Sequence, residues 1–218
     1  MTTAARAADL RAALIGPLFL PGEPGYDEEC STYNLVTPLR PAIAVGAAGV
    51  ADVQAAVRFA AAAGTSVAIR GGGHIVAAPS EGSVLINMRR MNAVTVDPEA
   101  RVVRIEGSAL WQDVLDALTP HALAALNGSS PTVSAIGYLL GGGHSPTLGR
   151  SRGWAAEYVS AIEIVTADGE ARRATADENP DLFFAVRGTK GNFGVVTAIE
   201  TRVFPIARIL AGGALVRR

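Results

Sequence analysis

The chain has 218 residues, of which 49% are hydrophobic, and a formal net charge of −1. At about 150 residues per domain, this length predicts one large domain or two smaller lobes with a sizeable core. The near balance of 19 basic and 20 acidic residues makes nucleic acid an unexpected partner, while a mean hydropathy of +0.28 excludes disorder and suggests that part of the surface is meant for a partner, a cofactor or a further domain.

The predicted elements begin with a short amphipathic helix over residues 4–14. Asp9 and Arg11 interrupt the approach to the apolar run that follows, and Pro17 lies inside it. Because no small-residue cleavage site comes next, we do not expect a signal peptide.

A strand–helix–strand unit follows and runs into a glycine-rich segment. Residues 42–45 predict a strand, residues 50–60 repeat apolar positions at helical spacing, and Gly64 provides a stop. Residues 66–69 predict the next strand, which leads directly into Arg-Gly-Gly-Gly-His at 70–74.

Short strands dominate the rest of the chain. Helices are predicted at 110–118, where apolar residues share one face, and at 179–186, where Pro180 occupies the first turn. The further predicted strands are 83–86, 93–96, 101–106, 159–166, 170–175 and 195–203. Many short strands with a few helices predict an α+β fold with an antiparallel component.

Several classes of site and location are excluded or not expected. Cys30 is the only cysteine, so an intramolecular disulfide and a Cys-based zinc site are excluded. The three histidines are widely separated, and we expect no metal. Residues 117–149 carry no Asp, Glu, Lys or Arg, but proline and glycine interrupt them, so we expect a segment buried in protein and no membrane association.

Three glycine-rich runs stand out, at 70–74, 141–144 and 191–194. Glycines after a strand can turn with positive φ and present N–H groups to an anion, and Arg70 adds a positive charge, so the first run could cradle a diphosphate. A solvated turn explains its spacing equally well. Two Gly-Gly-Gly-His runs suggest that the backbone approaches one extended ligand at two places. No G-x-G-x-x-G follows a strand, so a Rossmann site is not supported.

The ordered set of motifs resembles the PCMH-type FAD-binding domain of the FAD-linked oxidases related to berberine bridge enzyme, in the vanillyl-alcohol oxidase / p-cresol methylhydroxylase group. The matching segments are 21–26, Asn34, 40–41, 52–53, 70–74, 131–133, Gly137, 141–143, 166–169, 179–188 and 191–197. The resemblance implies two α/β lobes with FAD between them. It implies one FAD-binding domain over residues 1–208 with a lobe boundary near 95–108, and residues 209–218 as the truncated start of a missing substrate domain or a tail.

The resemblance also implies roles for individual residues. Residues 70–74 would bind the FAD diphosphate, and His74 would bond covalently to the flavin 8α-methyl group, a role that suits a neutral imidazole nitrogen; a non-covalent histidine is the alternative. The implied cofactor-binding residues are Arg70, Gly71, Gly72, Gly73, His74, Ser130, Pro131, Thr132, Val133, Gly137, Gly141, Gly142, Gly143, His144, Glu157, Gly194, Val195 and Val196.

Some positions depart from the family pattern. Ser130 stands where doubly linked relatives have cysteine, and a hydroxyl cannot replace a thiolate in that chemistry, so we expect at most one covalent link, through His74. Ser134 replaces a usual glycine, Glu157 a usual aspartate, and Thr189–Lys190 a usual Gly-Gly pair. We expect a structural role for His121, and core positions for Trp111 and Trp154.

The implied function is that of an FAD-dependent oxidoreductase, or its flavin half, which passes a substrate hydride to flavin N5 with reoxidation by O2. The small-molecule substrate is not identified, and the domain expected to supply the catalytic base is absent; Tyr138 and His144 are the only nearby candidates. The alternatives are a non-catalytic or truncated flavin-binding module, whose open flavin face a partner chain or a homo-oligomer would cover, and a flavin-free relative. The default location is the cytoplasm.

Overall fold

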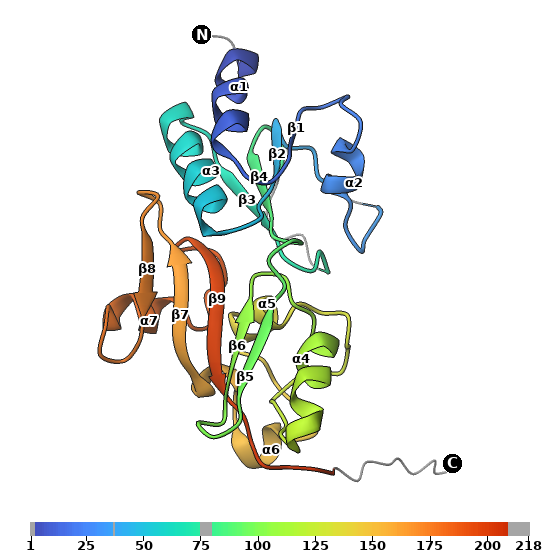
Figure 1. Cartoon of the computed structure of the whole chain (residues 1–218), viewed down its shortest axis with the longest axis vertical. Helices are drawn as coiled ribbons and strands as arrows, with labels where there is room; N and C mark the ends of the chain where they lie inside the picture. The colour runs from blue at the N-terminus through green and yellow to red at the C-terminus, as the bar shows by residue number, and fades with distance from the viewer. Residues whose placement is uncertain (1–2, 37, 75–79, 209–218) are drawn as a thin grey trace, which may run out of the picture.

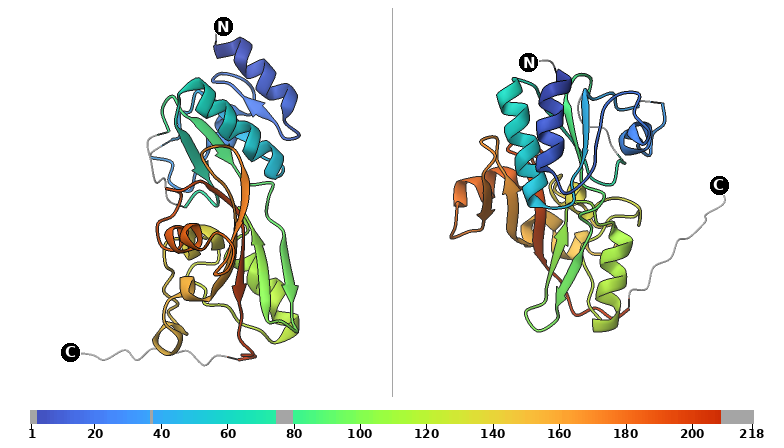
Figure 2. Two further views of the ribbon diagram at one scale, coloured as in Figure 1. Left: turned by 90° about the vertical axis from the view of Figure 1, so that its left-hand side faces the viewer. Right: turned by 45° about the horizontal axis from the view of Figure 1, so that its top comes forward.

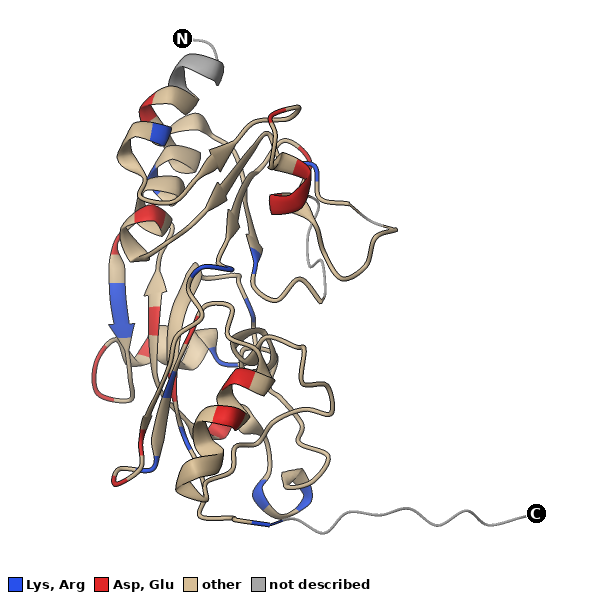
Figure 3. Cartoon of the chain, turned by 45° about the vertical axis from the view of Figure 1, so that its right-hand side comes forward, with Lys and Arg blue, Asp and Glu red and all other residues tan. Residues whose placement is uncertain are grey.

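The computed structural model describes residues 3–36, 38–74 and 80–208, so the expected tail at 209–218 lies outside the described residues. The chain forms two lobes, one above the other in Figure 1, each built around its own sheet. Acidic and basic residues are scattered over both lobes in the view of Figure 3. None of the described helices has the length and apolar character needed to cross a membrane.

The first lobe contains a four-stranded sheet in the order β1-β2-β4-β3. Its strands are β1 (Leu18–Phe19), β2 (Ile43–Gly46), β3 (Val67–Arg70) and β4 (Val84–Asn87). The two strands β2 and β3 both pair with β4 in parallel, and β1 pairs with β2 antiparallel. Because the carboxyl ends of parallel strands meet at one edge, Arg70 and Asn87 lie side by side where β3 and β4 end.

Helices cover both faces of this sheet. Helix α1 (Thr3–Ala13) and α3 (Val50–Ala63) lie side by side on one face, as the views in Figures 1 and 2 show. The short α2 (Tyr26–Cys30) packs on the other face. The strands alternate accordingly: Ile43 and Val45 join the core under α3, while Ala44 joins the cluster under α2.

The second lobe contains an antiparallel sheet in the order β5-β6-β9-β7-β8. Its strands are β5 (Val94–Asp97), β6 (Val102–Glu106), β7 (Val159–Val165), β8 (Ala171–Ala174) and β9 (Val195–Arg202). Its α-helices are α4 (Trp111–Leu118), α5 (Ala135–Leu139), α6 (Gly149–Arg152) and α7 (Pro180–Val186). Two 3-10 turns complete it, at Thr119–His121 and Ala155–Tyr158.

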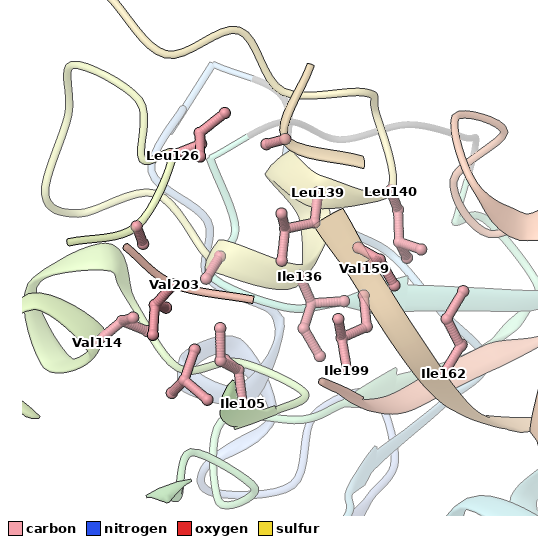
Figure 4. Packing of buried hydrophobic residues seen from close by; sticks show 14 of the residues in the cluster. Ile105, Val114, Leu126, Ile136, Leu139, Leu140, Val159, Ile162, Ile199 and Val203 are labelled. Carbon is pink, nitrogen blue, oxygen red and sulfur yellow. The ribbon is translucent and has the colours of Figure 1, made fainter. Parts of the chain in front are cut away.

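The two faces of this sheet differ in character. One face packs against α4 and α5, and residues such as Ile105, Ile136 and Ile199 share its core cluster, part of which Figure 4 shows. Elsewhere charged side chains pair across the strands: Arg104 donates to Glu163, and Arg173 donates to Glu200. This alternation is typical of a sheet with one buried and one solvated face.

The lobes share residues at their junction. The chain crosses from the first sheet to the second between Asn87 and Val94, ahead of the boundary near 95–108 expected from the sequence, because β5 already pairs with β6. Val165 at the end of β7 and Val195 at the start of β9 belong to the core of the first lobe. The second sheet therefore closes the core under α3.

The two-lobed α+β architecture and nearly all of the predicted strands and helices are confirmed. The sequence missed α2, α5 and α6, which are four or five residues long. Trp111 is only 1% exposed, as expected of a core residue. The core position expected for Trp154 is wrong: this side chain is 53% exposed, because the residue precedes the 3-10 turn and its ring meets His144 at the surface.

Candidate cofactor site

The first glycine run begins where β3 ends, and Arg70 is anchored below it. Its Nε donates to the carbonyl of Ser31 at 2.6 Å and one of its terminal nitrogens donates to Oδ1 of Asn87 at 3.2 Å. A Cβ on Gly73 would lie 3.2 Å from the guanidinium. Burial lowers the pKa of Arg70, but a guanidinium keeps its charge in proteins. A fixed positive charge therefore lies next to the backbone of Gly73.

A half-buried ion pair between Glu29 and Arg90 lies next to this anchor. Asn87 Nδ2 donates to the carbonyl of Glu29 at 2.9 Å. The carboxylate of Glu29, which is almost fully buried, accepts two hydrogen bonds from Arg90, each of 2.9 Å. Such a bidentate pair is rigid as well as strong, so α2 and the end of β4 together fix the position of Arg70.

The backbone of the first run lies against the start of α5. A Cβ on Gly72 would lie 3.1 Å from the amide nitrogen of Ser134, and one on Gly71 would lie 3.3 Å from the Ser134 hydroxyl. Side chains at these two positions would crowd Ser134. The hydroxyl of Ser134 is buried and has no hydrogen-bond partner among the described residues. An unpaired buried hydroxyl beside a glycine-rich turn fits a site for a polar ligand.

The second run follows α5 and packs on the 3-10 turn after Trp154. Gly142 and Gly143 have φ values of 98° and 67°, which favour glycine. Their carbonyls accept hydrogen bonds from the amides of Ala156 and Ala155, each of 2.9 Å. His144 is exposed and turns its ring toward Trp154, at 5.5 Å between centroids. Part of this run therefore serves packing within the second lobe.

The third run connects the other two. A Cβ on Gly191 would lie 3.1 Å from the end of the Ile69 side chain on β3. The amide of Lys190 donates to the carbonyl of Leu140 at 3.1 Å, and its side chain lies across Gly141, where a Cβ would meet Lys190 Cε at 3.2 Å. The three runs thus converge around α5, although they are far apart in the sequence.

His74 ends the first run and stacks on Tyr33. The two ring centroids are 5.1 Å apart with an interplanar angle of 15°. The amide of Tyr33 donates to the carbonyl of Gly73 at 2.9 Å. Sequence reasoning missed Tyr33, because nothing in its spacing relates it to a histidine that lies beyond a helix and two strands.

The remaining predicted residues occupy several environments. The Ser130 hydroxyl lies 3.1 Å from that of Thr132 on an exposed turn. The carbonyls of Pro131 and Val133 accept from the amides at the start of α4. Gly137 lies on α5, and a Cβ there would meet nothing within 4 Å.

The other predicted positions lie beyond α5. Glu157 accepts a hydrogen bond from the amide of Trp154 and so caps the 3-10 turn. On β9, Val195 packs in the core of the first lobe and Val196 in that of the second. Gly194 has a φ of 146°, and a Cβ there would clash with the carbonyl of Val165.

Tyr138, one of the two candidates for a base, has a buried hydroxyl without a partner among the described residues. Its ring contacts Trp111 edge-on at 5.3 Å. Burial raises the pKa of Tyr138 to about 12, so the hydroxyl stays protonated near neutral pH. A general base must start the reaction deprotonated, and burial disfavours that form of the Tyr138 hydroxyl.

A groove of about 1180 Å³ lies between the lobes on the side of α3, β3 and α7. Its lining includes Val57, Ile69, Asp168, Asn179 and Phe193. The lining also includes the whole third run, residues 191–194, and Val195 after it, but none of the residues of the first two runs. It is thus next to the point where the runs converge, not identical with it.

The residues around α5 fit a ligand with a diphosphate and extended rings. Glycine backbone at the first run, the unpaired hydroxyl of Ser134 and the open space beside Gly137 offer donors and room. The positive charge of Arg70 lies directly behind the run. The second and third runs contribute backbone on the other side of α5.

Comparisons with known proteins agree with this arrangement. The model of a family described as FAD binding domain matches residues 41–175. The (R)-6-hydroxynicotine oxidase of Paenarthrobacter nicotinovorans is 30% identical over 200 residues, which cover 91% of this chain and 43% of that protein. This chain therefore spans less than half the length of that relative.

Solved structures show the same fold. Xylooligosaccharide oxidase from Myceliophthora thermophila, solved with xylobiose, superposes with a TM-score of 0.85 at 30% identity, covering 92% of this chain and 43% of that one. Glucooligosaccharide oxidase from Acremonium strictum, which carries a 6-S-cysteinyl, 8α-N1-histidyl FAD, superposes with a TM-score of 0.83 at 28% identity, covering 91% and 42%.

Proposed function

Because this chain belongs to the FAD binding domain family, we propose that it is the flavin-binding part of an FAD-linked oxidoreductase of the oxidase type. The observation that supports this most directly is the convergence of three glycine runs around α5, with the Ser134 hydroxyl left unpaired among the described residues. Bound FAD would supply the chemistry, by accepting a hydride from a small-molecule substrate and returning electrons to O2.

The residues of this chain bind and orient the cofactor in this proposal. The backbone amides of Gly71–Gly73 and the hydroxyl of Ser134 would donate to the diphosphate, and Arg70 would contribute a fixed positive charge. Gly137 would leave room for the flavin, since a Cβ there meets nothing within 4 Å, and the backbone at 141–143 and 194–196 would line the flavin and its ribityl chain. Ser130, Thr132 and Glu157 would contribute further polar contacts.

We further propose that attachment is covalent and single, through His74. The presence of a histidyl link in the Acremonium relative supports this proposal. That relative also carries a cysteinyl link, for which Ser130 offers no thiolate. The base for substrate oxidation is not assigned to any residue of this chain. The cytoplasm is the proposed location, because a single cysteine needs no oxidising compartment.

Denaturing gels test the covalent link. Purified protein incubated with FAD is expected to keep flavin fluorescence in its band after SDS and acid. The His74→Ala variant is expected to bind FAD reversibly and to lose the fluorescence, while His121→Ala and His144→Ala keep it. Fluorescence retained by His74→Ala would show that the link is elsewhere. A chain that binds no FAD in titrations would refute the proposed function itself.

A second candidate function is a flavin-binding module that needs a partner. The observation that favours it is the apolar surface that Trp154 and Phe193 present. In this reading a partner chain or a second copy covers the flavin face. Light scattering with and without FAD tests whether a second copy is that cover. A monomer at all concentrations argues against self-association, and a dimer that forms with FAD supports it.

A further inference from the structure

The ring of Tyr33 is held against His74 although it gains little from burial. Tyr33 is 72% exposed, yet its ring is nearly parallel to the imidazole at 5.1 Å. An exposed aromatic ring is normally free to change rotamer on a nanosecond timescale. Its stacked position therefore reflects the local backbone and the contact with the imidazole.

The backbone around Tyr33 is fixed to the glycine run at two points. The amide of Tyr33 donates to the carbonyl of Gly73 at 2.9 Å. Two residues earlier, the carbonyl of Ser31 accepts from Arg70 Nε at 2.6 Å. Thr32 between them bonds to the carbonyl of Asn34 through its hydroxyl at 2.8 Å. Residues 31–34 therefore form a strap that lies along residues 70–74 and sets the register of the two rings.

We propose that Tyr33 is a positioning residue that holds the plane of the His74 imidazole for attachment to the flavin. This inference rests on the proposed function. Attachment forms a bond between an imidazole nitrogen and the flavin 8α carbon in place of one C–H bond. The imidazole N–H and that C–H each give up a proton, the flavin takes up the electron pair, and O2 then reoxidises it. The reaction needs the nitrogen aligned with the carbon, so a fixed ring plane speeds it.

The main test compares attachment rates. Tyr33→Ala is expected to slow the growth of acid-stable flavin fluorescence by roughly tenfold, the scale of freeing one side chain's rotamers. Tyr33→Phe keeps the ring and is expected to restore the wild-type rate. Leu35→Ala is the matched control, since Leu35 lies on the same loop and is 81% exposed. FAD affinity, measured in the His74→Ala background, is expected to change less than about twofold between these variants.

Two outcomes of that comparison would overturn the proposal. Attachment by Tyr33→Ala at the wild-type rate would show that the stack is not needed. A loss of reversible FAD affinity equal to the loss of attachment would make Tyr33 part of the binding pocket and not a positioning residue.

A second measurement works without any cofactor. Diethylpyrocarbonate acylates exposed histidines, and mass spectrometry reports each of the three separately. In the apoprotein, Tyr33→Ala is expected to speed the modification of His74 and to leave His121 and His144 unchanged. An unchanged rate at His74 would refute the stack whatever the flavin does. If His74 is freed as expected but the wild type binds FAD without attaching it, the covalent link fails, and the positioning role fails with it.

Discussion

Two glycines near α5, Gly143 and Gly137, have different structural roles. At Gly143 a Cβ would lie 2.5 Å from the ring of Tyr138, and its φ of 67° is in the left-handed region. At Gly137, on α5, a Cβ would meet nothing within 4 Å. The first glycine is required by packing inside the lobe. The second leaves space empty, and an empty space beside the converging runs is what a cofactor needs.

Alanine substitutions separate the two roles. Gly143→Ala is expected to lower the free energy of unfolding by about 2–4 kcal/mol, since it adds left-handed strain to overpacking. Gly137→Ala is expected to raise it by about 0.5–1 kcal/mol, because alanine favours a helix, while weakening FAD binding. Urea unfolding of the apoprotein and an FAD titration measure the pair. Unchanged FAD affinity in Gly137→Ala would place the flavin elsewhere.

Sequence motifs located the glycine runs, and the resemblance implied that they bind FAD. Neither predicted which residues far apart in the sequence are in contact. Nothing local marks Tyr33 as the neighbour of His74 or Ser134 as the neighbour of Gly72. Trp154 was misjudged for the same reason, because burial of an aromatic depends on the elements that cover it. Residue types indicate chemistry, whereas their partners depend on the fold.

At the scale of elements, Asp52 in the first turn of α3 joins three segments. Its carboxylate accepts from the amides of Ile15 and Gly16, which follow α1, and from Ala48, at 2.8, 3.0 and 2.8 Å. The side chain is completely buried. One carboxylate thus fixes the connection between α1 and β1 against the start of α3.

Removing this carboxylate is expected to be costly. Asp52→Ala removes the acceptor of three part-buried hydrogen bonds from backbone amides, and we expect a loss of about 3 kcal/mol in the free energy of unfolding. Asp9→Ala, on the exposed face of α1, is the control and is expected to change stability by less than about 0.5 kcal/mol. Chemical denaturation of the two variants provides the measurement. Equal stability of both would mean that water replaces the carboxylate.

The predictability of elements followed their hydrophobic pattern. Strands such as β7 and β9 have strong apolar runs, and α4 has one apolar face, so the sequence predicted them with nearly correct ends. Helix α5 has a glycine among its five residues and follows proline and serine, so no periodicity indicated it. The least regular part of the sequence therefore built the element on which the candidate site converges.

At the scale of the whole molecule, three buried groups make the free energy of unfolding decrease at high pH. Burial raises the pKa of Tyr26 to about 12, of Cys30 to about 11 and of Tyr138 to about 12. A group whose pKa is raised by folding contributes stability that is complete below its unfolded value and is lost as the pH rises through the folded value. The unfolded values are 9.0 for the thiol and 10.0 for the tyrosines.

We therefore expect stability to change little up to about pH 9 from these groups and to fall between about pH 9 and 12. Tyr138→Phe is expected to reduce that fall without loss at neutral pH, because its hydroxyl has no partner in the described part of the chain. Tyr26→Phe is expected to lose stability at neutral pH as well, because the Tyr26 hydroxyl donates to the carbonyl of Pro41 at 2.5 Å. Thermal unfolding across this pH range checks both. A wild-type-like decline in Tyr138→Phe would contradict the assignment.

The sharing of core residues between the lobes has a consequence for synthesis on the ribosome. The four strands of the first sheet have all left the exit tunnel soon after Asn87 is made, but Val165 and Val195 of its core are added much later. Chains grow at about 5–20 residues per second, so the nascent first lobe waits several seconds with the apolar surface near α3 incompletely covered. A chaperone that binds exposed apolar segments would find its target in that interval and lose it when β9 emerges.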